Sequence, residues 1–434
     1  MPTPILDKLT AYAKTGPARF HMPGHKGALP PPFDAVAPLD VTELPMTGDL
    51  YREGASGAIR QSEAQMARLL GAEGCVYLTG GASQGVFAML AAAARPGEAV
   101  FVDRMCHRSV YHALALLDLR PIYLQRDLLP PWGIPCLLNP SPLTMAEGRE
   151  PLIYTSPGYY GIIGPKPAHK GPLLCDAAHG AHLPFIPGGH APPGSVWVVS
   201  AHKTLGALGQ TACLLTDGTV PADTLRENAA VFGTASPSFA LLASLDMAQD
   251  ALQPGNRPDF RRITDFAEAL AKEEGRILSP KALPGGCALD PMKLVLCTGD
   301  GTGDAARIMG KYGVIPEMAD RSNLVFMLSP HNTDKDLRRL REAVRSIPQR
   351  PPVPPPPELP TPRQAATPKE VFWADRERVL LARAAGRTAA APVAPFPPGT
   401  PVLAPGEKID KIHIEILSDL WYNASVPEMV WVLA

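Results

Sequence analysis

Residues 172–204 read PLLCDAAHGAHLPFIPGGHAPPGSVWVVSAHKT, and the two apolar runs in this stretch decide the fold class. The runs, at 172–175 and 195–199, have the length and continuous apolar character of strands buried on both faces of a parallel sheet. Similar runs lie at 75–78, 99–102 and 151–155. Helix-like stretches lie at 58–70, 86–94 and 109–117. This alternation of strands and helices predicts an α/β fold with a mostly parallel sheet.

A smaller α/β unit is expected at 260–345. Its expected helices are 262–274, 303–312 and 334–344, and its expected strands are 292–297 (MKLVLC) and 323–328 (NLVFML). Nine of the fifteen residues from Pro348 to Pro362 are proline. Such a run favours an extended spacer, because proline fixes φ and donates no backbone hydrogen bond. The alternative is that this proline-rich run binds a proline-recognising partner domain.

These features divide the chain into five expected parts. They are an N-terminal segment 1–55, a large α/β domain 56–255, a small domain 256–346, a proline-rich linker 347–366 and a C-terminal domain 367–434. In the C-terminal domain, residues 407–416 (EKIDKIHIEI) alternate between apolar and polar side chains. This alternation predicts a strand there.

The composition excludes several classes of protein. Lys and Arg number 41 against 42 Asp and Glu, so no global field attracts nucleic acid or an anionic membrane. No apolar run reaches the roughly 18 residues of a membrane span, and the first residues lack the pattern of a secretory leader. The seven cysteines are widely spaced and form no C-x-x-C pair. They argue against a disulfide framework and favour a reducing compartment, the cytoplasm.

Polar residues stand where the predicted strands end, and open α/β sheets bind ligands at this edge. The run at 75–78 is followed by TGGASQG (79–85) and a helix, whose free N–H groups suit a phosphate. On the motif alone, a flexible turn is the better explanation. The other runs are followed by His107, Ser156, Asp176 and Lys203. Together, a phosphate cradle, a carboxylate and a lysine suit pyridoxal phosphate, which forms a Schiff base with a lysine.

The motifs around these residues resemble the ornithine/lysine/arginine decarboxylase family, in the family's order and over nearly the whole chain. The blocks are RFHMPGHKG (19–27), DVTELPMTGDLY (40–51), LTGGASQG (78–85), DRMCHRSVYHA (103–113), TSPGYYG (155–161), DAAHGAHLPF (176–185), SAHKTLGALGQ (200–210), TASPSF (234–239) and PFPPGTPVLAPGEKI (395–409). The chain resembles the shorter members, which lack the extra N-terminal domain. The resemblance implies the aspartate-aminotransferase-type fold (fold type I), pyridoxal phosphate as the cofactor and no metal.

The resemblance also implies roles for individual residues. Lys203 would form the Schiff base, and Asp176 would keep the pyridine nitrogen protonated. His107 and Ala178 would lie on the two faces of the ring. The expected catalytic residues are Lys203, Asp176, His107 and His202. The cofactor phosphate would be held by Gly81, Ala82, Ser83, Gln84, Ser200 and His202. Ser236 or Ser238 would reach the phosphate from a neighbouring subunit, which makes a homodimer the expected minimum.

Some positions depart from the family pattern. Ala82 and Gln84 stand where Thr or Ser is common, so phosphate binding would depend more on backbone N–H groups. Ala177 replaces an acidic residue, and Gly206 stands where proline often follows the lysine block. None of these changes removes a residue that the chemistry requires.

Other polar residues receive weaker assignments. His179 and His182 are left outside the cofactor site. A loop is expected around His21 and His25, because Pro23 and Gly24 between them break a helix. Glu407 is singled out as the acidic residue of the C-terminal block.

The predicted function is decarboxylation of arginine, lysine or ornithine to the corresponding amine, as in polyamine biosynthesis. The distal cation of such a substrate needs a carboxylate, because an unpaired buried charge is costly; the sequence does not identify it. Two alternatives stay open: another fold-type I enzyme, such as an aminotransferase or a lyase, and a binding protein that keeps the fold without turnover. A metal hydrolase built on the histidines lacks a suitable ligand spacing.

Overall fold

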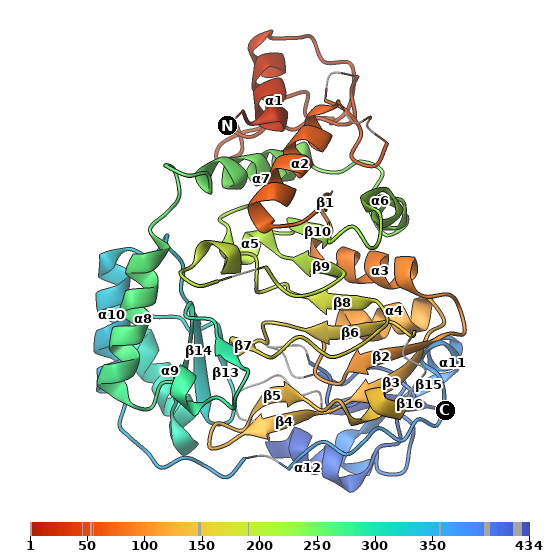
Figure 1. Cartoon of the computed structure of the whole chain (residues 1–434), viewed down its shortest axis with the longest axis vertical. Coiled ribbons are helices and arrows are strands. Elements are labelled where there is room, and N and C mark those ends of the chain that lie inside the picture. Colours follow the sequence, from red (N-terminus) through yellow and green to blue (C-terminus); the bar gives the residue numbers. More distant parts are fainter. Residues whose placement is uncertain are drawn as a thin grey trace. The chain divides into compact units, whose positions relative to one another are not determined.

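The structure is a computed structural model that describes residues 2–45, 47–52, 54, 56–145, 149–189, 191–355, 357–394, 400–419 and 428–434. The chain divides into two compact units (Figure 1). Unit 1 comprises Met1–Ala92 and Leu174–Pro258, and unit 2 comprises Ala93–Leu173 and Asp259–Ala434. The five domain boundaries expected from the sequence stay a prediction. The first five residues of the expected block 395–409 lie outside the described residues.

Unit 1 combines parallel and antiparallel strands. They are β1 (Gly74–Leu78), β8 (Leu173–Asp176), β9 (Val196–Val199) and β10 (Ala212–Thr216), in the order β1-β10-β9-β8. β8 and β9 run parallel, whereas β10 is antiparallel to both of its neighbours. The helices are α1 (Pro4–Lys14), α2 (Ala58–Leu70), α3 (Gly81–Ala93), α5 (Ala201–Thr204), α6 (Ala222–Val231) and α7 (Phe239–Ala251). Helices α2 and α6 pack against β1.

Helix α1, which the sequence analysis did not predict, is attached to α7 by a buried carboxylate. Asp246 accepts hydrogen bonds from the backbone N–H groups of Ile5 (2.6 Å) and Leu6 (3.1 Å). Both N–H groups belong to the first turn of α1, where a helix offers them no acceptor. Burial raises the pKa of Asp246, against the opposing effect of its hydrogen bonds. The start of the chain is therefore fixed by packing within unit 1.

Unit 2 contains the parallel strands β2 (Ala99–Asp103), β3 (Arg120–Leu124) and β6 (Leu152–Thr155), in the order β6-β2-β3. Three antiparallel pairs are β4 (Arg126–Leu129) with β5 (Ile134–Leu138), β7 (Ile162–Ile163) with β11 (Ala288–Leu289), and β15 (Arg376–Leu380) with β16 (Met429–Leu433). A further sheet has the order β12 (Lys293–Cys297), β14 (Asn323–Met327), β13 (Met318–Ala319). The helices are α4 (Arg108–Leu116), α8 (Phe260–Glu274), α9 (Thr302–Lys311), α10 (Asp334–Ser346), α11 (Pro368–Trp373) and α12 (Lys411–Asp419).

The predicted α/β fold with a mostly parallel sheet is confirmed, and every strand and helix expected between 58 and 345 is present within a few residues. The strands that were not predicted are β3, β4, β5, β7, β10, β11, β13, β15 and β16. The strand predicted at 407–416 is wrong, because Lys411–Asp419 forms helix α12. The side chain of His413 accepts a hydrogen bond from the N–H of Asp410 (3.0 Å), which fixes the start of the helix. His413 is also buried, whereas Lys411 and Glu415 of the same helix are exposed.

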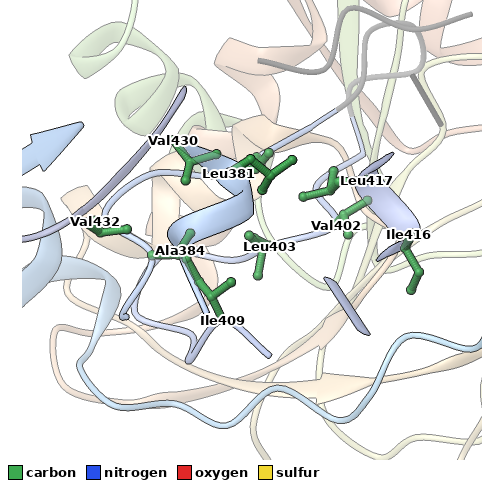
Figure 2. Packing of buried hydrophobic residues seen from close by; sticks show 11 residues of the cluster. Leu381, Ala384, Val402, Leu403, Ile409, Ile416, Leu417, Val430 and Val432 are labelled. Atoms are coloured by element: carbon green, nitrogen blue, oxygen red, sulfur yellow. The ribbon is translucent and has the colours of Figure 1, made fainter. Parts of the chain in front are cut away.

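The C-terminal part of unit 2 has its own hydrophobic core (Figure 2). The buried residues are Leu381, Ala384, Ala389, Val393, Val402, Leu403, Ile409, Ile416, Leu417, Val430 and Val432. They come from β16, α12 and the connecting segments, and Figure 2 shows their side chains gathered between these elements. Residues distant in sequence thus form one small core after the proline-rich linker.

The proline-rich linker is held along unit 2 by side-chain donors. The carbonyl oxygen of Pro354 accepts a hydrogen bond from Arg321 (3.2 Å), and that of Pro360 accepts one from Gln125 (3.0 Å). Arg350 pairs with Asp300 and Asp304. Proline keeps its carbonyl acceptor although it lacks a donor, so arginine and glutamine side chains bind the backbone of this segment.

Two further findings concern the whole described chain. None of the described helices is long and apolar enough to cross a membrane. All seven cysteines are free thiols, six of them buried.

Candidate active site

Lys203 and Asp176 lie at the ends of two adjacent parallel strands of unit 1. Asp176 is the last residue of β8, and Lys203 lies in the short helix α5 that follows β9. Because β8 and β9 are parallel, their carboxyl ends meet at the same edge. The N–H of Ser200 donates a hydrogen bond to the carbonyl oxygen of Ala178 (3.2 Å), which joins the segments after the two strands. The sequence-based prediction that these segments come together is confirmed by this bond.

The ammonium nitrogen of Lys203 lies 3.1 Å from Nε2 of His179. His179 is buried, whereas Lys203 is exposed in the single chain. A neutral imidazole whose Nε2 is unprotonated accepts a hydrogen bond from a lysine ammonium. His179 was not predicted to belong to the site, because the spacing of Asp176 and His179 in the sequence does not show which histidine meets the lysine.

Asp176 presents a buried carboxylate at the end of its strand. Its side chain is 4% exposed, and Oδ1 accepts a hydrogen bond from the N–H of Ala178 (3.2 Å). This bond holds the backbone of Ala178 next to the Asp176 carboxylate. The Ala178 side chain is half-buried. A buried carboxylate that keeps oxygen acceptors available can bind a protonated ring nitrogen.

The first turn of α3 carries the candidate phosphate site. Gly81 has a φ of +74°, which glycine adopts without strain. Ser83 is exposed, while Gly81 and Ala82 are half-buried. The first N–H groups of an α-helix have no acceptor within the helix, and the helix dipole favours an anion there. Gln84 differs from its neighbours because it is buried and its side-chain amide already binds three groups of unit 1.

Ser200 and His202 flank the lysine. Ser200 is buried and precedes the first residue of α5. Nδ1 of His202 lies 2.9 Å from the carbonyl oxygen of Thr211. That contact assigns the proton to Nδ1 and leaves Nε2 as an acceptor when the ring is neutral.

The two serines predicted to reach the phosphate from a neighbouring subunit differ in this chain. Ser236 is exposed. Ser238 caps helix α7, because its hydroxyl oxygen accepts a hydrogen bond from the N–H of Leu241 (3.4 Å). Its hydroxyl therefore has a structural role within the chain, and Ser236 is the more available of the two.

His107 belongs to unit 2, where it caps helix α4. Its Nδ1 accepts a hydrogen bond from the N–H of Ser109 (3.3 Å) and lies 2.9 Å from the Ser109 hydroxyl. The cap orients the imidazole ring. The stacking predicted for His107 stays a prediction.

The other residues singled out in the sequence have local partners. Residues 20–29 form turns and loop, as predicted for the segment with His21 and His25. His25 pairs with Asp40 (3.1 Å), and His21 bonds the hydroxyl of Tyr12 (2.5 Å). Glu407 is fully buried and pairs with Arg104. Among the residues that the structure describes, no group of three or more His, Cys, Asp and Glu side chains could hold a metal ion.

Comparisons with known proteins agree with this fold. The lysine decarboxylase LdcF of Francisella novicida aligns with 100% of this chain and 81% of its own, with a TM-score of 0.82 at 17% identity. A structure of SPT with PLP aligns with 80% of this chain and 85% of its own, with a TM-score of 0.53 at 12% identity. The chain therefore has the type I fold that was expected from the sequence.

The sequence comparisons identify the family. Residues 3–273 match the major domain of Orn/Lys/Arg decarboxylases, and residues 355–423 match their C-terminal domain. An arginine decarboxylase of Bacillus subtilis (strain 168) is 27% identical over 467 residues, which cover 96% of this chain and 93% of that protein. The chain belongs to the Orn/Lys/Arg decarboxylase family. The family resemblance inferred from the sequence motifs is confirmed.

Proposed function

We propose that the protein is a pyridoxal phosphate-dependent decarboxylase that converts arginine, lysine or ornithine to the corresponding amine. The observation that carries the proposal is the contact of Lys203 with His179 beside the buried carboxylate of Asp176. The family supports the reaction class, and relatives named arginine decarboxylase and lysine decarboxylase support a basic amino acid as the substrate.

The residues of unit 1 fit pyridoxal phosphate. The exposed hydroxyl of Ser83 and the N–H groups of the first turn of α3 would hold the phosphate. Ser200 and His202, next to Lys203 in the chain, would support them. Asp176 would bind the protonated ring nitrogen, and Lys203 would hold the cofactor covalently. Ala178 would contact one face of the ring.

When bound, pyridoxal phosphate supplies a ring that accepts the electron pair left behind as the α-carboxylate departs as carbon dioxide. Asp176 supports this by keeping a negative charge next to the ring nitrogen. Lys203 and His179 together can hold and move a proton, because the two nitrogens are within hydrogen-bonding distance. One of them then delivers the proton that Cα requires.

Lys203 is exposed in the single chain, yet a lysine acts as a nucleophile when its amine loses water and charge. The cofactor, the substrate and a second subunit are the groups that would shield the Lys203 amine from water. A homodimer is therefore part of the proposal. The N-terminal segment offers Phe20, Met22 and Phe33 for such contacts, since these apolar side chains are 95%, 61% and 63% exposed.

The setting of the reaction is also part of the proposal. A diamine or agmatine as the product supports a role in polyamine biosynthesis. Free thiols suit the reducing conditions of the cytoplasm.

A cofactor and product assay tests the function. Purified protein with added pyridoxal phosphate is expected to show a visible absorbance band that borohydride removes. Incubation with each basic amino acid should release the amine and one carbon dioxide per turnover, and light scattering should give at least twice the mass of one chain. A protein that stays colourless with added cofactor contradicts the proposal, and keto-acid formation would favour an aminotransferase instead.

Replacing His179 with Gln is expected to lower kcat while the cofactor remains bound. The substitution removes the base that contacts Lys203, and loss of a positioned acid or base typically costs about 10²- to 10⁴-fold in rate. Single-turnover kinetics and the visible spectrum of the variant measure the two effects separately. His331→Gln is the control, because His331 is exposed in unit 2. Wild-type kcat in His179→Gln would exclude a role in proton transfer.

A further inference from the structure

The side-chain amide of Gln84, in the first turn of α3, forms three hydrogen bonds within unit 1. Its Oε1 accepts a hydrogen bond from the N–H of Gly80 (3.0 Å). Its Nε2 donates to the hydroxyl oxygen of Tyr51 (2.8 Å) and to the carbonyl oxygen of Ala229 (2.8 Å). Gln84 is 4% exposed. One buried amide therefore ties the turn before α3 to the N-terminal segment and to helix α6.

The backbone around Gln84 leaves room for this amide only because two positions are glycine. A Cβ atom on Gly80 would lie 2.7 Å from Oε1 of Gln84. A Cβ atom on Gly233 would lie 2.0 Å from the hydroxyl oxygen of Tyr51 and 2.5 Å from Nε2 of Gln84. Gly233 immediately precedes the block TASPSF (234–239). The Tyr51–Gln84 pair thus rests directly on the segment that leads to Ser236.

Tyr51 is itself oriented by the chain. The carboxylate of Asp49 accepts hydrogen bonds from the N–H groups of Tyr51 (2.8 Å) and Arg52 (3.1 Å). Burial raises the pKa of Tyr51, and the hydrogen bond from Gln84 opposes this shift. The phenol therefore stays protonated. Gln84 is the donor in its hydrogen bond with Tyr51, so the hydroxyl proton of Tyr51 takes no part in that bond. The pair places no negative charge beside the candidate phosphate site.

The family resemblance implies a hydroxyl residue at this position, whereas Gln84 directs its side-chain amide to Tyr51 and Ala229 of unit 1. We propose that Tyr51 and Gln84 act together as positioning residues for the phosphate turn at the start of α3. Gln84 takes up the N–H of Gly80 and fixes the start of α3, which leaves the N–H groups of Gly81, Ala82 and Ser83 for the phosphate. The pair acts through the backbone and does not replace the missing hydroxyl as a ligand. This inference rests on the proposed use of pyridoxal phosphate.

Cofactor titrations of three variants test the role of the pair. Gln84→Ala removes all three hydrogen bonds, and it is expected to raise the Kd for pyridoxal phosphate about 10-fold. Tyr51→Phe removes one bond and should raise the Kd about 3-fold. The double variant should bind about as weakly as Gln84→Ala, because the two side chains act as one unit. Each Kd is measured from the visible absorbance of the full-length protein.

Pyridoxal without the phosphate distinguishes a positioning role from general damage to the fold. The three variants should bind pyridoxal as the wild type does, since only the phosphate turn changes. Equal losses for pyridoxal and pyridoxal phosphate would overturn the inference, and so would an unchanged Kd for pyridoxal phosphate. Gln61→Ala is the matched control, because Gln61 is exposed on α2 and its side-chain amide donates a hydrogen bond to the nearby carbonyl oxygen of Ser56.

Failure of the inference and failure of the proposed function give different results. Wild-type protein that does not bind pyridoxal phosphate contradicts the proposed function. Wild-type protein that binds it, with variants that bind it equally well, contradicts the role of Tyr51 and Gln84 alone. A variant that is too unstable to titrate is replaced by Gln84→Glu, which keeps the side-chain size but cannot donate to Ala229. Its added charge next to the turn should weaken binding of the phosphate ester more than binding of pyridoxal.

Discussion

Replacing Lys203 with Ala is expected to abolish turnover and to remove the visible absorbance band of the protein with bound pyridoxal phosphate. Lys203 is the proposed attachment point of the cofactor, and its nitrogen lies 3.1 Å from His179. The substitution removes both the covalent link and one of the two groups that can move the Cα proton. The decarboxylation rate should fall by at least about 10³-fold. Amine formation and the absorbance spectrum are the measurements.

Lys166→Ala is the matched control for this result, since Lys166 is exposed in unit 2 and belongs to neither strand end of the site. The control variant should keep the spectrum and the rate of the wild type. The fold should survive in Lys203→Ala, because the exposed lysine side chain contributes little packing. Full turnover by this variant would overturn the proposed mechanism.

The strand ends that carry the site were predictable because their chemistry is local. β8 and β9 are short apolar runs, and Asp176 and Lys203 follow them directly in the sequence. Parallel pairing then brings both residues to the same edge. Nothing beyond strand length, apolar character and the position of a polar residue was needed.

The contact of His179 with Lys203 could not be predicted in this way. It depends on the turn after β8, where the N–H of Gly180 donates to the carbonyl oxygen of Ala177 (2.7 Å). That turn, and not the spacing in the sequence, decides whether His179 or His182 meets the lysine. The same holds for Gln84, whose partners Tyr51 and Ala229 are 33 and 145 residues away.

Helix α12 shows where a pattern misled the prediction. Residues 407–416 alternate in polarity, but only some of the polar side chains are exposed. His413 lies 3.2 Å from Glu407, and both residues are buried. His413 is buried beside the Glu407 carboxylate, so polarity in the sequence does not by itself locate the solvent-facing side. The partner of His413, Glu407, contacts Arg104, which lies 303 residues earlier in the chain. A local pattern in the sequence does not show such a contact.

Arg104 and Glu407 form a fully buried ion pair within unit 2. The NH2 nitrogen of Arg104 lies 3.0 Å from Oε2 of Glu407, and both side chains are 0% exposed. Arg104 also donates to the carbonyl oxygens of Pro401 and Val402 and to the hydroxyl of Tyr111. Burial lowers the pKa of the Arg104 guanidinium, but Tyr111 and Glu407 outweigh this effect and raise it. Arg104 therefore stays charged and requires its partner.

Replacing Glu407 with Gln should lower the free energy of unfolding by about 3–5 kcal/mol. The substitution keeps the shape of the side chain but leaves the buried charge of Arg104 without a counterion, and breaking such a pair from one side carries this cost. The Glu407 carboxylate also accepts a hydrogen bond from the N–H of Ala404 (2.8 Å). An amide in its place has only one oxygen, so it can accept this bond in only one of its two orientations. Denaturant unfolding of the full chain, followed by circular dichroism, measures the loss.

The double variant Arg104→Met/Glu407→Leu decides whether the loss comes from the unpaired charge. Apolar side chains of similar volume often replace a buried ion pair at little cost, so the double variant should be more stable than Glu407→Gln. Lys369→Ala is the matched control, because Lys369 also joins the C-terminal part of unit 2 to an earlier segment through Asp118 (2.8 Å), but at the surface. Its loss should stay below about 1 kcal/mol. A double variant as unstable as Glu407→Gln would show instead that the hydrogen bonds of Arg104 to Pro401 and Val402 hold the C-terminal part in place, and that the ion pair only satisfies the charge.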